Sequence, residues 1–583
     1  QVRLPNENTN PKLFNYRLSL KADNVKVTIT TREHAISKLY KDRKLKYFLK
    51  DKFVKYVENI FSSTLNEENS SLITSIILGK SSYMEEESLD FYREIGLAHV
   101  LAVSGLHIGV ISSFLIFLLS RLGIKRRTNV IITLSIIWLY GYMIDYPASI
   151  LRANIMFTII LYSQLIHRPF DSINNLALAA FILLVINPYY LFDVGFQLSF
   201  LATFSLLSFR PKIAHLFYPY DNRLTNSLAS ILAVHIGLFP IQAYYFNSFN
   251  PLSLLANLVV VPLLSLSLII GMMVLSLYFW MGRFSLFFAY LLNLLLSLQF
   301  KLLRLLDSLP ISLVKLKSPE MFSIILFYIS LFIIFKMIKI DKIDKRIIRV
   351  IVVYLIILLV WDFFLIIRDE SMEIHFIDVG QGDAILISTK YHNYMMDTGG
   401  SLFGNFDIGK NITLPYLEKL GIRRLDAVFI SHFHEDHCQA LPTLMDQLRI
   451  DNIVSGYAPE KGEVAEAIRE SKIPFTIVNR GDRVYLDKNI VLEVLWPKED
   501  VAYLSENNKS LVALLRYRNF NILFTGDLEK EGEGILAKEM EEVDIIKIPH
   551  HGSKTSSTEG FLEKTRPQYG VISVGRNNFY NHP

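Results

Sequence analysis

Residues 431–438 read SHFHEDHC and directly follow the apolar run AVFI at 427–430. Three histidines, one glutamate and one aspartate lie within positions 432–437. Histidines two apart on extended backbone can hold one metal ion, while an aspartate and a histidine that begin the next helix can hold a second. A short apolar run that ends in such a cluster predicts a strand that delivers metal ligands to the edge of an α/β sheet.

Other apolar runs of the region 371–583 also end in polar residues suited to a site. They are IHFID followed by VGQGD, with Asp378 and Asp383; YHNYMMDTGG, with Asp397; NILFTGD, with Asp527; VDIIKIPHH, with His550 and His551; and YGVISVGRNNFYNHP, with His582. Side chains at the same ends of neighbouring strands converge on one sheet edge. We therefore expect Asp527 to bridge two ions, an arrangement that activates water for attack at phosphorus.

The remainder of the chain is far more apolar than this region. All 583 residues together are 51% hydrophobic, and the mean hydropathy is +0.32, so a single soluble domain is excluded. Long apolar runs recur at 96–120, 129–144, 153–166, 174–187, 194–208, 226–246, 252–280, 284–305, 321–337 and 348–367. Because a span needs roughly 20 apolar residues, they predict a polytopic α-helical membrane domain at 96–367 with about 9–10 spans.

Lysine and arginine gather between alternate runs and set the expected orientation. They are Arg121, Lys125, Arg126, Arg127, Arg168, Arg210, Lys212, Lys336, Lys339, Lys342, Lys345, Arg346 and Arg349. Positive loops stay in the cytoplasm. With ten spans, all these residues fall on one side, which predicts a multi-pass protein of the cytoplasmic (inner) membrane with an extracytoplasmic C-terminal domain. A count of nine would break this agreement.

The region before the first run has two parts. Residues 1–31 are polar with short alternating runs such as VKVTITT, typical of a strand remnant. Residues 32–95 begin with a basic stretch whose apolar residues recur at helical spacing, which predicts amphipathic basic helices. Such a helix can lie on a membrane surface or against a neighbouring helix, or it can contact nucleic-acid phosphates.

Several motifs carry a resemblance that covers nearly all of the chain. HFIDVGQGDAILI, MMDTGG, SHFHEDH, NNKSLVALL, LFTGDLEKEGE, KIPHHGSKTSS and ISVGRNNFYNHP resemble the metallo-β-lactamase-like domain of the ComEC family of DNA-uptake channels in natural competence. GLAHVLAVSGLHIG, LRANIM, NPYYLFDVGFQLSF and ANLVVVPLL are similar to the membrane region of that family, and NPKLFNYRLSL resembles the tail of its OB-type domain. Because the chain starts at Gln1 and stops after NHP, we interpret it as a fragment of such a protein, with the domain at 371–583 truncated.

The resemblance implies a fold and a function. It implies an αββα sandwich at 371–583 and an OB-type remnant at 1–31. The membrane domain would pass single-stranded DNA into the cytoplasm, and the outer domain would be a metal-dependent nuclease, a hydrolase that degrades the other strand of incoming double-stranded DNA. The expected cofactors are two divalent metal ions, Mn or Zn. The expected partners are membrane lipids, other competence proteins and a cytoplasmic motor, since the sequence has no P-loop pattern; a homo-oligomer is allowed.

The ligand set is fixed only in part. His432, His434, Asp436, His437 and Asp527 are the expected metal ligands, and His434, Asp436 and Asp527 are also the expected catalytic residues, with Asp436 accepting a proton from water. No histidine occurs from 438 to 526, where the superfamily usually supplies a further ligand. The remaining positions are therefore open among His550, His551 and His582.

Other polar residues have supporting roles in this interpretation. Asp378, Asp383 and Asp397 are expected to orient loops and the residues that surround the ligands. Those expected to bind phosphate oxygens, or else to have structural roles in turns, are Asn508, Ser510, Ser553 and Lys554. Those expected to line a channel, or else to bond neighbouring helices, are His99, Ser104, His107, Arg152 and Gln197. The lone cysteine, Cys438, excludes an intrachain disulfide and is expected to pack at a helix start.

Two other functions remain to be distinguished. A membrane-anchored hydrolase of the same superfamily could act on another ester, but an anchor needs only one helix, and this chain has many apolar runs. A channel with a catalytically inactive, DNA-binding domain would not need the full set of H-x-H-x-D-H, GD and HHGS motifs. The sequence therefore favours a channel with an attached nuclease.

Overall fold

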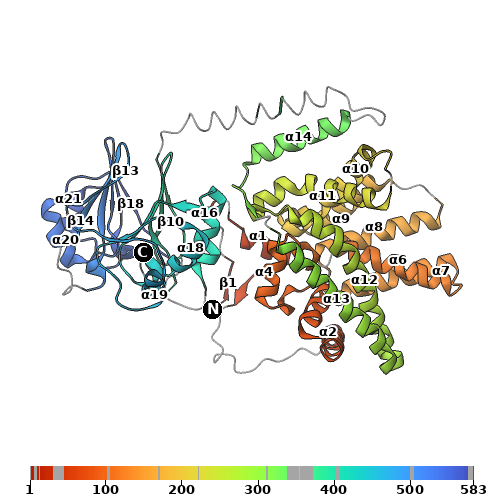
Figure 1. The fold of residues 1–583 in the computed structure, drawn as a ribbon. Coiled ribbons are helices and arrows are strands. Elements are labelled where there is room, and N and C mark those ends of the chain that lie inside the picture. The colour runs from red at the N-terminus through yellow and green to blue at the C-terminus, as the bar shows by residue number, and fades with distance from the viewer. Residues whose placement is uncertain are drawn as a thin grey trace. The chain divides into compact units, whose positions relative to one another are not determined.

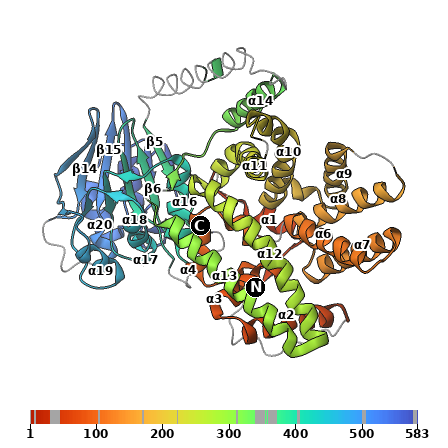
Figure 2. The same ribbon diagram turned by 45° about the vertical axis from the view of Figure 1, so that its right-hand side comes forward.

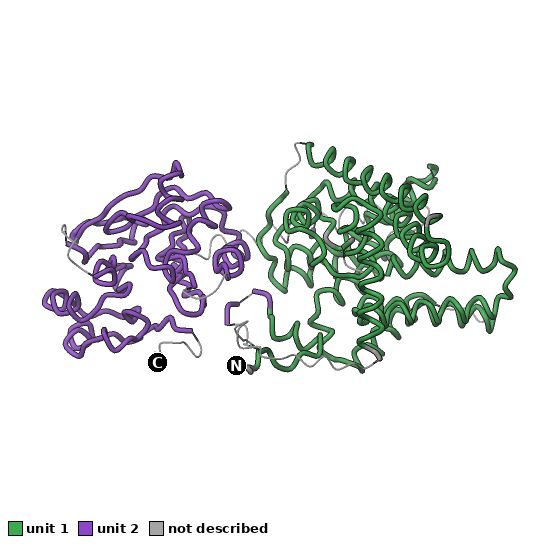
Figure 3. Tube along the Cα trace, turned by 90° about the horizontal axis from the view of Figure 1, so that it is seen from below, with its two compact units in different colours: residues 1–7, 15–351 green, residues 8–14, 352–583 purple. Residues whose placement is uncertain are grey.

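The computed structural model describes residues 2–582 apart from a set of gaps. The gaps are 6–8, 12, 30–44, 102–104, 168–170, 221, 310–312, 338–352, 355–356, 358–371, 402–405, 499–504 and 576–581. The chain divides into two compact units (Figure 3). The first comprises residues 1–7 and 15–351, and the second comprises residues 8–14 and 352–583.

The first unit is built from helices (Figure 1). They are α1 Tyr16–Ala22, α2 Leu45–Thr64, α3 Glu67–Leu78, α4 Glu86–Glu94, α5 Ala98–Leu101, α6 Gly105–Arg121, α7 Arg126–Met143, α8 Ala148–Leu165, α9 Ser172–Ile186, α10 Val194–Leu216, α11 Arg223–Phe246, α12 Leu252–Met281, α13 Ser285–Asp307 and α14 Met321–Met337. Several starts are capped by the residue that precedes them, because a side-chain oxygen satisfies an unpaired backbone N–H there. Asp171, Asp193 and Asn222 cap α9, α10 and α11 in this way. Helices α10 and α11 pack side by side, as do α12 and α13 (Figure 2).

Four described helices are long and apolar enough to cross a membrane: α8, α11, α12 and α13. They make the chain a multi-pass membrane protein. Three shorter apolar helices lie at Gly105–Arg121, Ser172–Ile186 and Met321–Phe335. Nine of the ten predicted runs coincide with a helix, α6 to α14. The tenth, 348–367, falls outside the described residues except at 353–354 and 357, so the count of 9–10 spans stays a prediction.

One detail of the loop prediction is wrong. Arg210 and Lys212, expected in a loop after the fifth run, lie inside α10, which continues through Pro211 to Leu216. The helix can continue because both cations are bound: Arg210 donates to side-chain oxygens of α11, and Lys212 donates to the Phe335 carbonyl oxygen of α14. An apolar run therefore marks where a helix is buried, and not where it ends.

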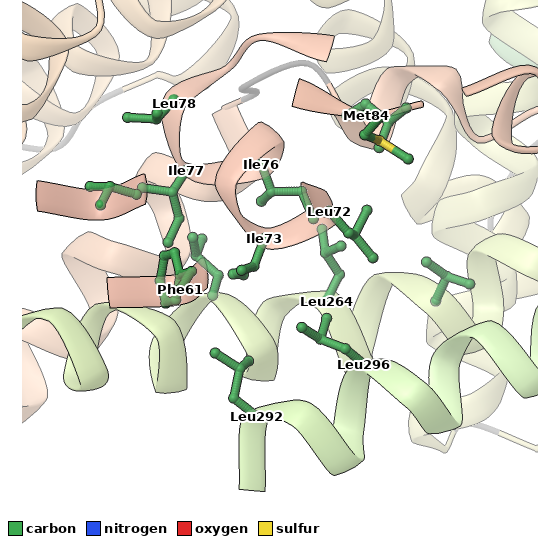
Figure 4. Packing of buried hydrophobic residues seen from close by; sticks show 14 of the residues in the cluster. Phe61, Leu72, Ile73, Ile76, Ile77, Leu78, Met84, Leu264, Leu292 and Leu296 are labelled. Carbon is green, nitrogen blue, oxygen red and sulfur yellow. The ribbon is translucent and has the colours of Figure 1, made fainter. Parts of the chain in front are cut away.

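The amphipathic helices α2 and α3 pack into the core of the helical unit (Figure 4). The described part of the basic stretch, α2, therefore packs its apolar face against α12 and α13. The buried residues that meet there are Val57, Ile60, Phe61, Leu72, Ile73, Ile76, Ile77, Leu264, Leu292 and Leu296. The preceding residues 32–44 lie outside the described part.

The N-terminal strand remnant is small. β1 Val2–Arg3 and β2 Thr28–Ile29 pair antiparallel. Two residues in each strand do not define an OB-type fold, so the OB-type origin of residues 1–31 stays a prediction.

The second unit holds two six-stranded sheets. One has the order β12-β11-β9-β7-β6-β5, and the other has the order β13-β14-β15-β16-β17-β18. The strands of the first are β5 Glu373–Phe376, β6 Ala384–Ser388, β7 Asn393–Thr398, β9 Ala427–Ile430, β11 Ile453–Ser455 and β12 Phe475–Ile477. Those of the second are β13 Arg483–Asp487, β14 Ile490–Trp496, β15 Val512–Tyr517, β16 Phe520–Phe524, β17 Ile545–Lys547 and β18 Tyr569–Val571.

Both sheets are buried on both faces, so this unit has four layers. In β15, Ala513 and Leu515 face the core between the sheets, while Val512 and Leu514 face an outer core. This alternation follows from the two-residue period of a strand. Helices α16 Leu414–Leu420, α18 Leu441–Gln447 and α19 Glu463–Glu470 cover the first sheet, and α20 Lys530–Leu536 and α21 Glu559–Thr565 cover the second (Figure 1). The predicted αββα sandwich is confirmed.

Candidate metal centre

The polar residues predicted at strand ends do converge. Asp397 lies in β7, His432 follows β9, Asp527 follows β16, and His551 follows β17. The short helix α17, Glu435–Cys438, follows β9 directly and carries Asp436 and His437. Asp383, His437, Asp527 and His551 are buried, and their ligand atoms lie within 4.8 Å of one another.

Two glycines allow the backbone to close around α17. A Cβ atom on Gly400 would lie 1.7 Å from the Glu435 carbonyl oxygen, and one on Gly382 would lie 2.3 Å from the Asp436 carbonyl oxygen. Gly382 also has φ +139°, which favours glycine. The motifs GQGD and MMDTGG therefore supply glycine where two loops press against the helix that carries the ligands.

Hydrogen bonds hold three imidazole rings with Nε2 toward a common point. Nδ1 of His437 lies 2.9 Å from Asp397 Oδ2, and Nδ1 of His551 lies 2.8 Å from the Ser573 carbonyl oxygen. Nδ1 of His432 lies 3.1 Å from Ser431 Oγ. A ring that donates through Nδ1 keeps the Nε2 lone pair for a metal ion.

Asp527 lies where these rings meet. Its Oδ2 is 3.3 Å from His437 Nε2, 3.4 Å from His551 Nε2 and 4.0 Å from His432 Nε2. Asp436 Oδ2 lies 3.4 Å from the same His551 nitrogen. The predicted bridging position of Asp527 agrees with this geometry.

The residues present fit divalent metal ions. His437 Nε2 and His551 Nε2 are buried and have no hydrogen-bond partner among the described residues, although carboxylate oxygens surround them. Such nitrogens are costly to bury unless another group binds them. His432 Nε2 and His434 Nδ1 lie 3.0 Å apart, close enough to hold one ion together. The donor set of imidazole nitrogens and carboxylate oxygens suits zinc or manganese.

The electrostatics keep the carboxylates of Asp436 and Asp527 ionised. Burial would raise the pKa of Asp436, but contacts with His551 and His437 lower it to about 2. Burial likewise opposes ionisation of Asp527, yet the charges of His437, His551 and Lys547 hold its pKa well below the usual range. Burial would lower the pKa of His437, but the charges of Asp527 and Asp397 raise it well above the usual range, so a metal ion that binds Nε2 must displace a proton. Ionised carboxylates are what metal ligation needs.

Cys438 adjoins the centre without belonging to it. It is buried, and its thiol donates to the His434 carbonyl oxygen. Burial, with the nearby charge of Asp397, raises the pKa of the thiol. A thiol held neutral is a poor metal ligand, so its position fits the expected packing role.

The structure distinguishes His550, His551 and His582, the three alternatives for the remaining ligand positions. His551 faces the centre, whereas Nδ1 of the adjacent His550 lies 3.0 Å from Thr555 Oγ1 and 3.4 Å from Glu529 Oε1. His582 lies beside His550, with 6.0 Å between ring centroids. The geometry therefore favours His551 as the ligand and places His550 and His582 beside it.

The predicted supporting residues occupy different places. Asp397 orients His437, and Ser510 Oγ accepts the backbone N–H of Asp527. Asn508 is buried and accepts the backbone N–H of Glu529 through its side chain. Ser553 contacts Thr555, and Lys554 is exposed.

Two further members of this set lie in the loop between β5 and β6. Asp378 accepts hydrogen bonds from Thr9, Asn10 and the backbone of Gly380, so it holds a loop. Asp383 forms an ion pair with Lys547. Lys547 itself is a residue that sequence reasoning missed. The available signal was a lone lysine at the end of the apolar run DIIK, directly before IPHH.

The channel candidates lie on four different helices or outside the described residues. Arg152 on α8 is buried and donates to the Ser199 carbonyl oxygen and to Thr203 on α10. His107 on α6 is also buried, and Gln197 on α10 donates to the Leu191 carbonyl oxygen. His99 lies on α5, and Ser104 falls outside the described residues.

Two sheets between helix layers, with histidines and aspartates at the strand ends, define a metallo-β-lactamase-type domain. Residues 377–576 match the metallo-β-lactamase superfamily. Residues 76–340 match the competence protein family. The chain belongs to the competence proteins of the ComEC and ComE operon protein 3 type, with a C-terminal metallo-β-lactamase domain.

Several curated proteins are similar to this chain. ComE operon protein 3 of Bacillus subtilis is 29% identical over 552 residues, which cover 91% of this chain and 70% of that protein. Recombination protein 2 of Haemophilus influenzae is 25% identical, covering 88% and 68% of the two chains. Competence protein ComA of Neisseria gonorrhoeae is 30% identical over 35% of this chain and 27% of its own length.

Solved structures are similar to part of the chain. Human tRNase Z, short form, covers 35% of this chain and 93% of its own, with 15% identity and a TM-score of 0.24. A metallo-β-lactamase from Cronobacter sakazakii covers 28% of this chain and 66% of its own, with 12% identity and a TM-score of 0.20.

Proposed function

We propose that this protein internalises DNA during natural transformation. Its helical unit passes one strand through the cytoplasmic membrane, and its metallo-β-lactamase domain cleaves the other strand outside as a metal-dependent nuclease. Membership of the competence protein family and the membrane helices support the first role. The observation that carries the second is the convergence of Nε2 atoms and carboxylate oxygens around Asp527 Oδ2.

At the proposed active site, different residues bind metal ions, orient the imidazole rings and accept a proton. Divalent ions held there would supply Lewis-acid chemistry to a phosphodiester. His432 and His434 can hold one ion, and Asp436, His437 and His551 can hold another, with Asp527 Oδ2 between them. Asp397 and Ser573 keep two of these rings in the tautomer that ligation needs. Asp436, held ionised, is the group that accepts a proton from water.

The proposed active site is open on one side. Among the proposed ligands His434 is exposed, next to the exposed Glu435, while the other ligands are buried. Substrate therefore approaches from the side of His434. A nucleic acid meets this requirement because its phosphates are repeated along an accessible backbone.

Buried polar groups support a transport role for the helical unit. Arg152 is 6% exposed within α8, and no carboxylate forms an ion pair with it among the described residues. A buried cation in an apolar span is expensive and marks a functional position by default. In the proposed transport, a phosphate of the passing DNA strand is the anion that would pair with Arg152.

The remaining parts of the proposal concern the surroundings of the protein. The positive residues between alternate runs favour a cytoplasmic side opposite the C-terminal domain. DNA would arrive through other competence proteins and leave with the help of a separate cytoplasmic motor. Membrane lipids surround the helices, and a homo-oligomer is compatible with this arrangement.

The test of the nuclease is metal-dependent cleavage by the full chain in detergent. Linear double-stranded DNA is incubated with and without Mn²⁺ or Zn²⁺, beside Asp436→Ala and His437→Ala. Each variant should lose about 100-fold or more in rate, because even the partners that orient metal ligands are worth about 10–100-fold. His392→Ala is the matched control, since His392 pairs with Asp426 on a different part of the domain and should leave the rate unchanged.

The other outcomes decide between the remaining functions. Bound metal without cleavage of DNA, but with hydrolysis of another phosphoester, would move the assignment to a membrane-anchored hydrolase. DNA binding without metal would indicate an inactive, DNA-binding domain. For the channel, Arg152→Met should reduce uptake of labelled DNA by cells while leaving cleavage by the purified chain unchanged.

A further inference from the structure

Lys547 is a buried cation inside the candidate metal centre. It ends β17, and its side chain is 1% exposed. Its Nζ donates to the Gly526 carbonyl oxygen at 2.9 Å, lies 3.4 Å from Asp527 Oδ1, and pairs with Asp383 Oδ2. A buried ammonium is costly unless it is paired. Three oxygen partners therefore mark a position built for a positive charge.

The lysine divides the two oxygens of Asp527 between different partners. Oδ1 faces Lys547, while Oδ2 faces the nitrogens of His437 and His551. A carboxylate held in this way offers one oxygen to metal ions. The second oxygen is withheld because the ammonium occupies its side of the group.

The ion pair with Lys547 also bears on whether Asp383 is a metal ligand. The Oδ2 atom of Asp383 lies 3.6 Å from His437 Nδ1, the nitrogen that faces Asp397. The other ring nitrogen, Nε2, faces Asp527. Asp383 Oδ2 therefore lies beside the His437 nitrogen that Asp397 already holds, and not beside the nitrogen that faces Asp527. Distance groups Asp383 with His437, Asp527 and His551, and what sets it apart is the ion pair of its Oδ2 with Lys547.

We infer that the Lys547 ammonium is a built-in cation of the metal centre, in the position between Asp383 and Asp527 where a further divalent ion would otherwise bind. Lys547 is thus a positioning residue, which keeps Asp383 from ligating and leaves Asp527 with a single ligand oxygen. This inference rests on the metal centre of the proposed function and does not depend on which ester the domain cleaves.

The test is metal binding by the full chain, with Mn²⁺ as the probe. Wild type, Lys547→Met, Asp383→Asn and the double variant are titrated in detergent, and bound Mn²⁺ is counted by mass spectrometry and electron paramagnetic resonance. Lys547→Met should bind one more Mn²⁺ per chain, or bind Mn²⁺ about 10-fold more tightly, because carboxylate charge sets affinity. Asp383→Asn should keep the wild-type stoichiometry, and the double variant should return to it.

Matched variants separate this role from simple packing. Lys547→Arg retains the charge and should keep the wild-type stoichiometry. Lys419→Met removes another largely buried lysine of the same domain, 7% exposed, and should change neither stoichiometry nor affinity. If Lys547→Met alone fails to fold, the double variant should fold, since a neutral amide at position 383 needs no cation; failure of both to fold would count against the inference.

Three results would overturn it. Lys547→Met with unchanged Mn²⁺ stoichiometry and affinity would show that the lysine only packs. Loss of an ion in Asp383→Asn would make Asp383 a ligand. A wild-type chain without bound Mn²⁺ would remove the metal centre itself, whereas metal binding without DNA cleavage would count against the nuclease alone.

Discussion

At the scale of single residues, the centre depends on which atom of each side chain is left for the metal ions. In His432, His437 and His551, the Nδ1 atom contacts an oxygen of a neighbouring residue, and in Asp527 the Oδ1 atom contacts Lys547. What remains is one nitrogen of each ring and one oxygen of Asp527, and of these nitrogens His437 Nε2 and His551 Nε2 have no hydrogen-bond partner among the described residues. The centre is therefore preorganised by partners that are not ligands themselves.

The contiguous motif SHFHEDH could be predicted because its spacing alone carries the chemistry. The choice between His550 and His551 could not, since adjacent residues look alike in a sequence and only backbone geometry separates them. Both have positive φ, +47° and +52°, and only one ring reaches the centre. Lys547 escaped prediction for a different reason: its partners lie on two other segments, the turn that follows β16 and the GQGD loop.

The first prediction concerns Gly400. Replacing it by alanine places a methyl group 1.7 Å from the Glu435 carbonyl oxygen, so α17 must move and carry Asp436 and His437 with it. We expect Gly400→Ala to lose about 3 kcal/mol or more of unfolding free energy, measured by pulse proteolysis in urea, together with Mn²⁺ binding. Gly534→Ala is the control, because no atom lies within 4 Å of its Cβ position in α20. That variant should be as stable as wild type or up to about 1 kcal/mol more stable. Equal stability of the two variants would contradict the close approach.

At the scale of elements, the alternation of apolar and polar residues was sufficient to predict the strands of the sandwich. The run IVLEVLW alternates buried and half-buried residues along β14, as a two-residue period requires. The membrane helices were harder to predict because apolar runs record burial and not hydrogen bonding. In α10 the run stops near 208, yet the helix continues to Leu216 through two cations that find partners on other helices.

The second prediction concerns the pH dependence of stability in the second sheet. Glu493 on β14 accepts hydrogen bonds from Arg483 and Arg516 on the flanking strands, both at 3.1 Å. Burial opposes ionisation, but the two arginines lower the pKa of Glu493 below its usual value of 4.5. A carboxylate with a depressed folded-state pKa stabilises the fold above the unfolded-state pKa, and the contribution is lost as the pH falls through the folded-state pKa.

We therefore expect Glu493→Gln to cost about 0.5–1 kcal/mol at pH 7, a value limited by solvent screening, and to cost less at pH 3. The measurement is the urea midpoint of the C-terminal unit at both pH values. Glu470→Gln, at an exposed end of α19, is the control and should show no such difference. A cost for Glu493→Gln that persists unchanged at pH 3 would mean that the ion pairs are not its source.

At the scale of the whole molecule, the two units are linked by more than one stretch of chain. Residues 8–14 belong to the second unit, although residues on either side of them belong to the first. Leu13 packs on the core between the first sheet and the helices that cover it. This arrangement could not be predicted from the sequence, because Thr9 and its partner Asp378 are 369 positions apart and the short segment carries no pattern of its own.

The segment bears on the metal centre through one loop. Asn10 Nδ2 donates to the Asp378 carbonyl oxygen at 2.7 Å, and the Asp378 backbone N–H donates to Asn10 Oδ1 at 2.8 Å. Asn10 is 7% exposed, so water does not readily replace these bonds. The same loop runs through Gly382, which presses on α17, to Asp383, which pairs with Lys547.

The last prediction is that Asn10→Ala loosens this loop from a distance along the chain. Loss of two buried hydrogen bonds should cost about 1–3 kcal/mol, and each 1.4 kcal/mol is about a tenfold change in an opening equilibrium. Backbone amides of 376–383 should therefore exchange with deuterium about 10-fold faster or more in the full chain, while those of β14 and β15 keep their rates. Phe14→Ala, at an exposed position of the same segment, should leave the loop unchanged. If Asn10→Ala also leaves it unchanged, residues 8–14 merely lie on the sandwich; if exchange rises and Mn²⁺ affinity falls with it, the N-terminal segment is part of what shapes the metal centre.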